Sequence, residues 1–262
     1  MTAKAALDEL NKKCTTLCED YHRKKGPSGD SNVWSGFGGP GDCTPNYRLL
    51  YSSAATFENH GGVMFLGTNP GGDHTAADPR HHEWPFSKSC YSAYLDECWD
   101  GQPKGCHPMQ EAALEVAAAI AGGREDGKRL LQRSPAGNLI PFRSERPKHL
   151  PRGLEKHGLK IGWELISRAK PRVLVLFTSN KERWGWLMKK LDWGLDPDLE
   201  KSFRPNWKYR ESKSSGSWPR FVFALPALNN KRNPAVEKIV EHFENRVDDI
   251  GHDRLCGSAA PA

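Results

Sequence analysis

Residues 63–73 read Val-Met-Phe-Leu-Gly-Thr-Asn-Pro-Gly-Gly-Asp, and this stretch decides the fold. Four apolar residues indicate a short buried strand, and the Gly, Asn and Pro residues after them indicate an abrupt turn. In an open parallel sheet, ligands bind in the loops beyond the carboxyl ends of the strands. The stretch lacks the Gly-Lys-Ser/Thr of a Walker loop and the three-glycine spacing of a dinucleotide fingerprint. It therefore predicts either a turn that holds a ligand or an ordinary strand-to-helix turn.

Predicted strands and helices alternate along the rest of the chain. Apolar runs indicate strands at 62–67, 172–177 and 220–225 and a short strand end at 138–141. Helical patterns occupy residues 5–24, 110–121, 154–168, 181–191 and 234–246. The alternation predicts an α/β fold, a three-layer sandwich with a short, mainly parallel central sheet and helices on both faces.

Long irregular segments interrupt this pattern. Residues 26–46 and 72–109 are predicted loops, and residues 192–219 are predicted to be irregular, basic and aromatic. We expect residues 1–250 to form a single domain with an N-terminal helix and long loop insertions. Residues 251–262 are predicted to form a disordered tail.

Composition narrows the class of protein without deciding it. The chain has 262 residues, 37% of them hydrophobic, and a net charge of +6, which permits an anionic partner such as nucleic acid without requiring one. No apolar run approaches the ~20 residues that span a bilayer, and residues 1–25 lack the apolar stretch of a signal peptide. We expect no membrane association and a cytoplasmic protein, associated with the nucleoid in a bacterium.

The seven cysteines do not suggest a disulfide framework, because the number is odd and the chain is long. Cys14 and Cys18 share one face of the first predicted helix, whereas Cys90, Cys98 and Cys106 recur at intervals of eight. No Cys-x-x-Cys pair occurs. Buried free thiols are the favoured interpretation, and a zinc or iron–sulfur site is the alternative.

Three further segments complete a recognisable order of motifs. They are Trp-Pro-Phe-Ser at 84–87, Asn-Leu-Ile-Pro-Phe-Arg-Ser at 138–144 and Leu-Pro-Ala-Leu-Asn-Asn-Lys-Arg-Asn-Pro at 225–234. With Gly-Thr-Asn-Pro-Gly-Gly at 67–72, their order and spacing resemble the uracil-DNA glycosylase superfamily. The similar branch has a Gly-x-Asn-Pro-Gly first motif and includes mismatch-specific, thymine-DNA and single-strand-selective members. The resemblance covers residues 61–243.

The resemblance implies a monofunctional DNA glycosylase, which flips a base out of DNA and hydrolyses its glycosidic bond. Asn69 matches the residue that positions the attacking water. Phe86 matches the aromatic ring that stacks on the extruded base, and Asn138 matches the amide that reads the base edge. The first motif supplies the other residues expected at the base: Gly67, Thr68, Pro70 and Gly71.

The same resemblance places DNA at the last motif, because residues 227–233 match the loop that enters the duplex. Basic and amide side chains expected on DNA are Arg143, Asn229, Asn230, Lys231 and Arg232. The basic segments 141–160 and 201–220 favour a nucleic-acid surface, although such charge runs also occur as plain solvated faces.

The chemistry of base excision fits these residue types without a metal or an organic cofactor. Positive charge develops on the sugar and negative charge on the departing base. Catalysis therefore needs a pocket that excludes bulk water, hydrogen-bond donors directed at the base and one oriented water. An amide such as Asn69 orients water but is no strong base. Asp73 is the first candidate for a base toward that water, and an exposed loop residue is the alternative.

Two positions bear on how closely the chain follows the pattern of that superfamily. Gly71 stands where members restricted to uracil carry a tyrosine, so the resemblance implies a pocket open to larger bases. The triplet 225–227, Leu-Pro-Ala, stands where many relatives have His-Pro-Ser, and the histidine that donates to the base is missing. Loss of such a donor typically costs ~2.7–4 kcal/mol of transition-state stabilisation.

Several functions remain open at this point. A glycosylase of this kind acts either in the repair of damaged or mismatched bases or in defence against phage DNA that carries modified bases. A non-catalytic DNA-binding module and a small-molecule hydrolase are the alternatives on the same fold. A monomer is the expected state.

Overall fold

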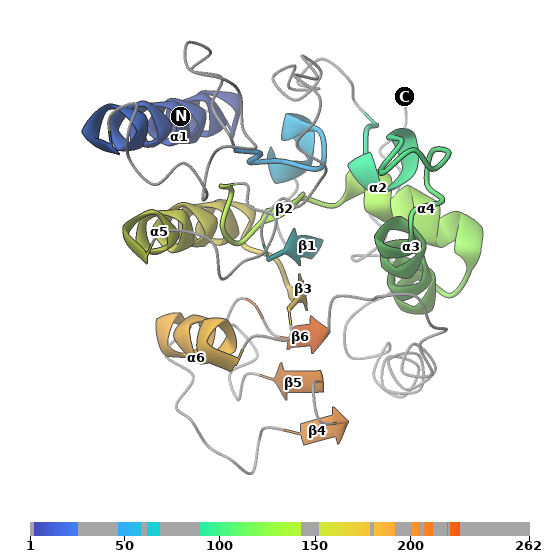
Figure 1. Ribbon diagram of the computed structural model, residues 1–262. Coiled ribbons are helices and arrows are strands. Elements are labelled where there is room, and N and C mark those ends of the chain that lie inside the picture. Colours follow the sequence, from blue (N-terminus) through green and yellow to red (C-terminus); the bar gives the residue numbers. More distant parts are fainter. Residues whose placement is uncertain are drawn as a thin grey trace.

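The computed structural model describes residues 3–25, 47–58, 62–68, 90–142, 152–178, 181–191, 201–204, 207–211, 219 and 221–225. These ranges contain a six-stranded sheet with the order β2-β1-β3-β6-β5-β4 (Figure 1). The strands are β1 (Val63–Gly67), β2 (Ala136–Asn138), β3 (Val173–Phe177), β4 (Lys201–Arg204), β5 (Trp207–Glu211) and β6 (Phe221–Leu225). The first four strands in the order are parallel, and β5 and β4 extend the sheet in antiparallel fashion.

Helices cover both faces of this sheet (Figure 1). On one face lie α1 (Ala3–Lys25), α5 (Arg152–Ala169) and α6 (Lys181–Lys190), and on the other lie α2 (Ala93–Asp96), α3 (Pro108–Ala121) and α4 (Arg124–Arg133). A 3-10 helix, η1 (Ala54–Glu58), follows the segment that runs beside β2. The protein is therefore a three-layer α/β sandwich with a short, mainly parallel sheet, as predicted.

The central strands are buried on both faces. Met64 and Leu66 of β1 pack into the cluster that includes α1, α5 and α6, whereas Val63 and Phe65 pack into the cluster that includes α2, α3 and α4. Successive side chains of a strand point to opposite faces, so a strand covered on both sides needs a continuous apolar run. This is why the apolar runs at 63–66 and 173–177 predict their strands correctly.

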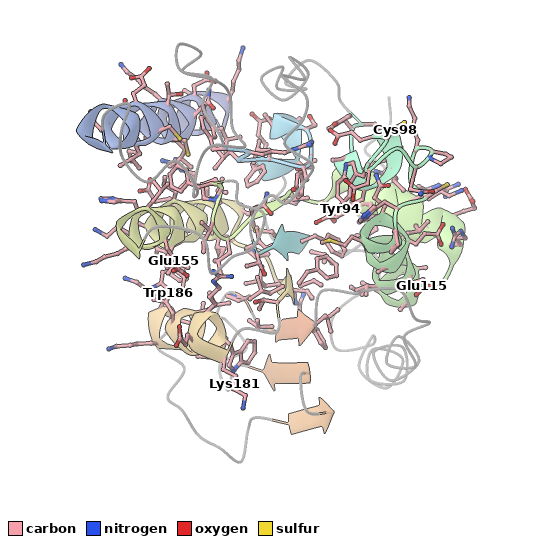
Figure 2. The ribbon with its side chains drawn as sticks, in the orientation of Figure 1. Tyr94, Cys98, Glu115, Glu155, Lys181 and Trp186 are labelled. Atoms are coloured by element: carbon pink, nitrogen blue, oxygen red, sulfur yellow. The ribbon has the colours of Figure 1, made fainter. Side chains whose placement is uncertain are left out.

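Both helical layers pack on the sheet through apolar clusters, and among the residues that Figure 2 labels, Tyr94 of α2 and Glu155 of α5 lie in opposite layers. Tyr94 of α2 is fully buried, with its ring 6.3 Å from the ring of Phe177 in β3. In the opposite layer, Arg183 of α6 is buried and its Nη2 donates to Oε1 of Glu155 in α5 at 3.0 Å. Apolar contact thus joins α2 to the sheet, and a buried cation joins α6 to α5.

The predicted elements that lie in the described ranges are confirmed to within a few residues. Helix α3 begins at Pro108 rather than at residue 110, because the His107 side chain caps the helix and proline suits its first position. The predicted strand end at 138–141 lies earlier, since β2 ends at Asn138. The predicted loop 26–46, the helix 234–246 and the tail 251–262 lie outside the described residues.

The prediction that residues 192–219 are irregular is wrong for two stretches. Lys201–Arg204 and Trp207–Glu211 form β4 and β5, which add to the sheet beyond β6. Their sequences mix charged and aromatic residues and show no long apolar run. The alternation Trp-Lys-Tyr-Arg at 207–210 is a short local signal for a strand, and the pairing of β5 with β6 supplies the hydrogen bonds that hold this backbone extended.

The prediction of one loop over 72–109 holds for residues 90–92 and 97–107 but is wrong at 93–96, which form α2, and at 108–109, which begin α3. Helix α2 has only four residues, which is too few to show a helical period in the sequence. Helix α4 is an element that the sequence pattern did not indicate. Only Gly127, Leu130 and Leu131 of its ten residues are buried, which is too sparse an apolar face to stand out.

The five cysteines in the described ranges divide into two kinds. Cys14 and Cys18 are buried free thiols, as predicted, and burial raises the pKa of Cys14 well above its usual value. The same interpretation is wrong for Cys90, Cys98 and Cys106, which are free but exposed, because they lie in turns and loops around α2. In the described ranges, no group of three or more His, Cys, Asp or Glu side chains is placed to hold a metal ion. No helix in those ranges is long and apolar enough to cross a membrane.

Candidate functional site

The strand ends that carry three of the predicted motifs meet in one row. Across the four parallel strands, Asn138 lies opposite Gly67, Gly67 opposite Phe177, and Phe177 opposite Leu225. The carboxyl ends of parallel strands share one edge of a sheet, which is where ligands bind in open α/β folds. The candidate site is this edge.

Gly67 and Asn138 are in direct contact there. A Cβ atom added to Gly67 would lie 2.5 Å from Oδ1 of Asn138, which is closer than real carbon atoms approach. The missing side chain of glycine leaves the space that the Asn138 amide occupies, so any other residue here would displace the amide. We call this space the Gly67 notch.

The amide of Asn138 is buried and only half satisfied. Its side chain is fully buried, and Nδ2 donates to the backbone carbonyl of Arg48 at 3.3 Å. A carbonyl only accepts, so this contact determines which end of the amide is nitrogen. Oδ1 has no hydrogen-bond partner among the described residues. A buried acceptor without a donor costs about 1–3 kcal/mol, which a bound water or a ligand donor at this position would offset.

Thr68 has a structural contact at the same edge. Its hydroxyl donates to the carbonyl of Phe177 at 2.8 Å, and its own carbonyl accepts from the backbone N–H of Ile140 at 3.0 Å. The backbone N–H of Leu139 donates to the carbonyl of Gly67 at 2.8 Å. These bonds extend the pairing of β1 and β2 past the ends of both strands, so Thr68 lies beside the residues that follow Asn138.

Leu225 occupies the position that matches the missing histidine. It is the last residue of β6, is 1% exposed and packs in the core cluster that contains Phe177. Its side chain has no donor, and its burial among apolar groups explains why leucine is stable there. The Leu225 side chain therefore offers no hydrogen-bond donor at this edge.

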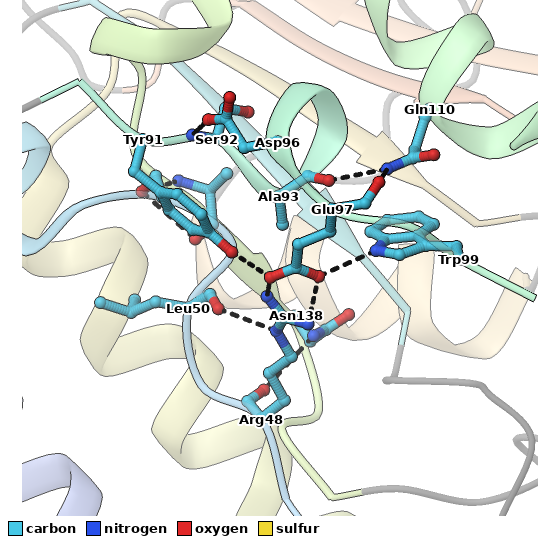
Figure 3. A network of polar contacts seen from close by, with 12 residues as sticks. Arg48, Leu50, Tyr91, Ser92, Ala93, Asp96, Glu97, Trp99, Gln110 and Asn138 are labelled. Carbon is cyan, nitrogen blue, oxygen red and sulfur yellow. Dashed lines mark hydrogen bonds and ion pairs between the residues drawn. The ribbon is translucent and has the colours of Figure 1, made fainter. Parts of the chain in front are cut away.

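A partly buried ion pair lies beside Asn138 (Figure 3). Nη1 of Arg48 donates to Oε2 of Glu97 at 2.8 Å, and Nη2 donates to Oε1. The hydroxyl of Tyr91 donates to Oε1, and Nε1 of Trp99 donates to Oε2 at 2.9 Å. Burial alone raises the pKa of Glu97, but the hydrogen bonds and charge of Arg48 outweigh it and lower the pKa to about 2. We call Arg48 and Glu97 the Arg48–Glu97 pair.

Sequence reasoning did not identify this pair. Its partners lie 49 residues apart, and neither belongs to a motif. The one local signal is an acidic residue amid the aromatic side chains of Tyr-Ser-Ala-Tyr-Leu-Asp-Glu-Cys-Trp-Asp at 91–100. An acid in such surroundings is either exposed or paired with a cation.

The pKa of Glu97 predicts how stability depends on pH. Because about 2 is below the ordinary 4.5, the ionised carboxylate stabilises the fold above pH 4.5, and this contribution is lost as the pH falls toward 2. Over that range we expect the free energy of unfolding to fall on the order of 3 kcal/mol further in the wild-type protein than in Glu97→Gln. Urea unfolding at a series of pH values measures the free energy of unfolding of the two proteins. If that free energy fell equally with pH in both, the prediction would be contradicted.

The other predicted site residues lie outside the described residues. They are Asn69, Asp73, Pro70, Gly71, Phe86, Arg143, Asn229, Asn230, Lys231 and Arg232. Their predicted roles stay predictions. Of the predicted residues that the structure describes, Gly67, Thr68 and Asn138 come together at one edge.

No protein-family model matches the chain, and a search of curated proteins found no match either.

Proposed function

We propose that this protein is a monofunctional DNA glycosylase that flips a base out of DNA and hydrolyses its N-glycosidic bond. The observation that carries the proposal is the buried Asn138 amide in the Gly67 notch, whose Oδ1 accepts no hydrogen bond among the described residues. An acceptor held in this way suits an N–H on the edge of a base. Its place at the carboxyl edge of the parallel sheet agrees with the resemblance of the motifs.

The proposed reaction needs few parts. Water adds to C1′ of the sugar, the bond from C1′ to the base breaks, and the base leaves with the bonding electrons and then gains a proton. Asn69 orients the water, Phe86 stacks on the base, and Asp73 is the proposed base toward water. The chain binds DNA as a monomer through Arg143 and the loop at 227–233.

The proposed substrate is a damaged, mismatched or modified base, larger bases included, because Gly71 replaces the tyrosine of uracil-restricted relatives. Repair and defence against modified phage DNA are both compatible with such a pocket. The second candidate function is a non-catalytic DNA-binding module. The buried Leu225 favours it, because the donor that stabilises the departing base is absent from that position.

Mass spectrometry of released bases tests the proposal. Purified protein is incubated with uracil-containing DNA, deaminated DNA and phage DNAs with modified pyrimidines. We expect one free base to appear, and Asn69→Ala to abolish its release while DNA affinity changes by no more than a few-fold. Full turnover by Asn69→Ala would refute the role of Asn69. Intact DNA binding without release of any base would favour the binding module.

A further inference from the structure

The backbone N–H and the backbone carbonyl of Arg48 both form hydrogen bonds with the segment that carries Asn138. Residues 47–53 run beside β2 and the residues after it, through isolated antiparallel bridges from Tyr47 to Phe142 and from Leu50 to Gly137. The backbone N–H of Arg48 donates to Pro141 at 2.7 Å, and its carbonyl accepts from Nδ2 of Asn138. The orientation of the amide thus depends on where the Arg48 backbone lies.

The side chain of Arg48 ties this backbone to the opposite layer. It is 13% exposed, and its Nε donates to the carbonyl of Leu50 at 3.2 Å while both terminal nitrogens contact Glu97. The guanidinium also lies 4.4 Å from the ring centroid of Tyr51, a favourable cation–π distance. All three nitrogens of the guanidinium thus donate hydrogen bonds, which hold the side chain between Leu50 and Glu97.

Glu97 is anchored in turn to α3. Gln110, fully buried in the first turn of that helix, donates from Nε2 to the backbone carbonyls of Ala93 at 2.8 Å and Glu97 at 2.9 Å. The Glu97 carboxylate meanwhile accepts from Tyr91 and from Arg48. A continuous set of hydrogen bonds therefore runs from α3 through Glu97 and Arg48 to the amide of Asn138 (Figure 3).

We propose that Glu97 and Arg48 are positioning residues, which hold the Arg48 carbonyl against Nδ2 of Asn138 and so keep Oδ1 turned toward the base. The contact of 3.3 Å is long for an amide donor, so a displacement of a few tenths of an ångström breaks it. Once it is broken, the amide is free to turn by half a rotation, which puts donors where the acceptor was. This inference rests on the proposed function in assigning Asn138 to the base.

Glu97→Gln tests it, because glutamine keeps the shape of the side chain and removes the charge that holds Arg48. The first readout is hydrogen exchange of the Asn138 side-chain amide by NMR, with the signal assigned by its loss in Asn138→Ala. We expect exchange in Glu97→Gln to be at least about tenfold faster than in the wild-type protein. This readout needs no substrate, so it tests the positioning whether or not the protein is a glycosylase.

The second readout is excision of the base that the wild-type protein releases. We expect kcat/KM to fall about 10- to 100-fold in Glu97→Gln, the range for loss of a hydrogen bond to a charged group. The matched control is Glu125→Gln, which removes the charge of a 74% exposed glutamate paired with Lys128 on α4. We expect the control to leave both readouts unchanged.

A milder variant covers the case in which Glu97→Gln fails to fold. Tyr91→Phe keeps the ring and removes one donor to the Glu97 carboxylate, and we expect a smaller change in the same direction. Amide exchange within twofold of wild type in a folded variant would overturn the inference, even if the protein proves to be a glycosylase. Absence of base release by the wild-type protein would overturn the proposed function instead.

Discussion

Gly67→Ala is expected to reduce base excision by at least a hundredfold while leaving a folded protein. The new Cβ would lie 2.5 Å from Oδ1 of Asn138, so the amide has to move out of the Gly67 notch. That movement also strains its bond to the Arg48 carbonyl, which is already 3.3 Å long. A misplacement of about 1 Å at a reacting centre typically costs about 10²-fold in rate. Single-turnover kinetics of base excision measure the loss of rate, and urea unfolding shows that the variant is folded.

The matched control is Gly62→Ala, which lies directly before the same strand and has no atom within 4 Å of an added Cβ. We expect it to excise bases at the wild-type rate. The double variant Gly67→Ala/Asn138→Ala removes the clash, so we expect stability to recover while activity stays lost. If Gly67→Ala kept wild-type activity, Asn138 would not read the base in the observed conformation.

Gly162→Ala is expected to have the largest effect on stability, with a loss of about 3 kcal/mol or more. The added Cβ would lie 2.0 Å from the carbonyl oxygen of Leu139 and 2.8 Å from its carbonyl carbon. These are backbone atoms, and the backbone N–H of Leu139 donates a hydrogen bond to the carbonyl of Gly67 at 2.8 Å. To relieve the clash, either α5 or the Leu139 backbone has to move, and movement of Leu139 would break its hydrogen bond to Gly67 at the edge of the sheet. Urea or thermal unfolding measures the loss.

Gly153→Ala provides the comparison within the same helix. An added Cβ at Gly153 meets nothing within 4 Å, and alanine is the better helix former. We expect its stability to equal or slightly exceed that of the wild-type protein. Equal stability of Gly162→Ala and Gly153→Ala would show that α5 does not pack against Leu139 as closely as the structure indicates.

Local patterns in the chain predict those parts of the fold that depend on burial alone. The run Val173–Phe177 predicts β3 because a strand covered on both faces has to be apolar at every position. Helices such as α5 follow from apolar residues spaced at the helical period. By contrast, β5 shows only a four-residue alternation and depends on its pairing with β6, and α4 buries only two leucines against α3, so the local pattern of each is short.

The sequence by itself determined the layered α/β class, the central strands and the residues that end them, because burial and turn formation are properties of neighbouring residues. Only the tertiary structure decided that Asn138 fits into the space left by Gly67, that Leu225 faces the core, and that Glu97 is bound to Arg48. Those facts depend on contacts between residues tens of positions apart. Such contacts form when the layers pack, so no local pattern in the chain encodes them.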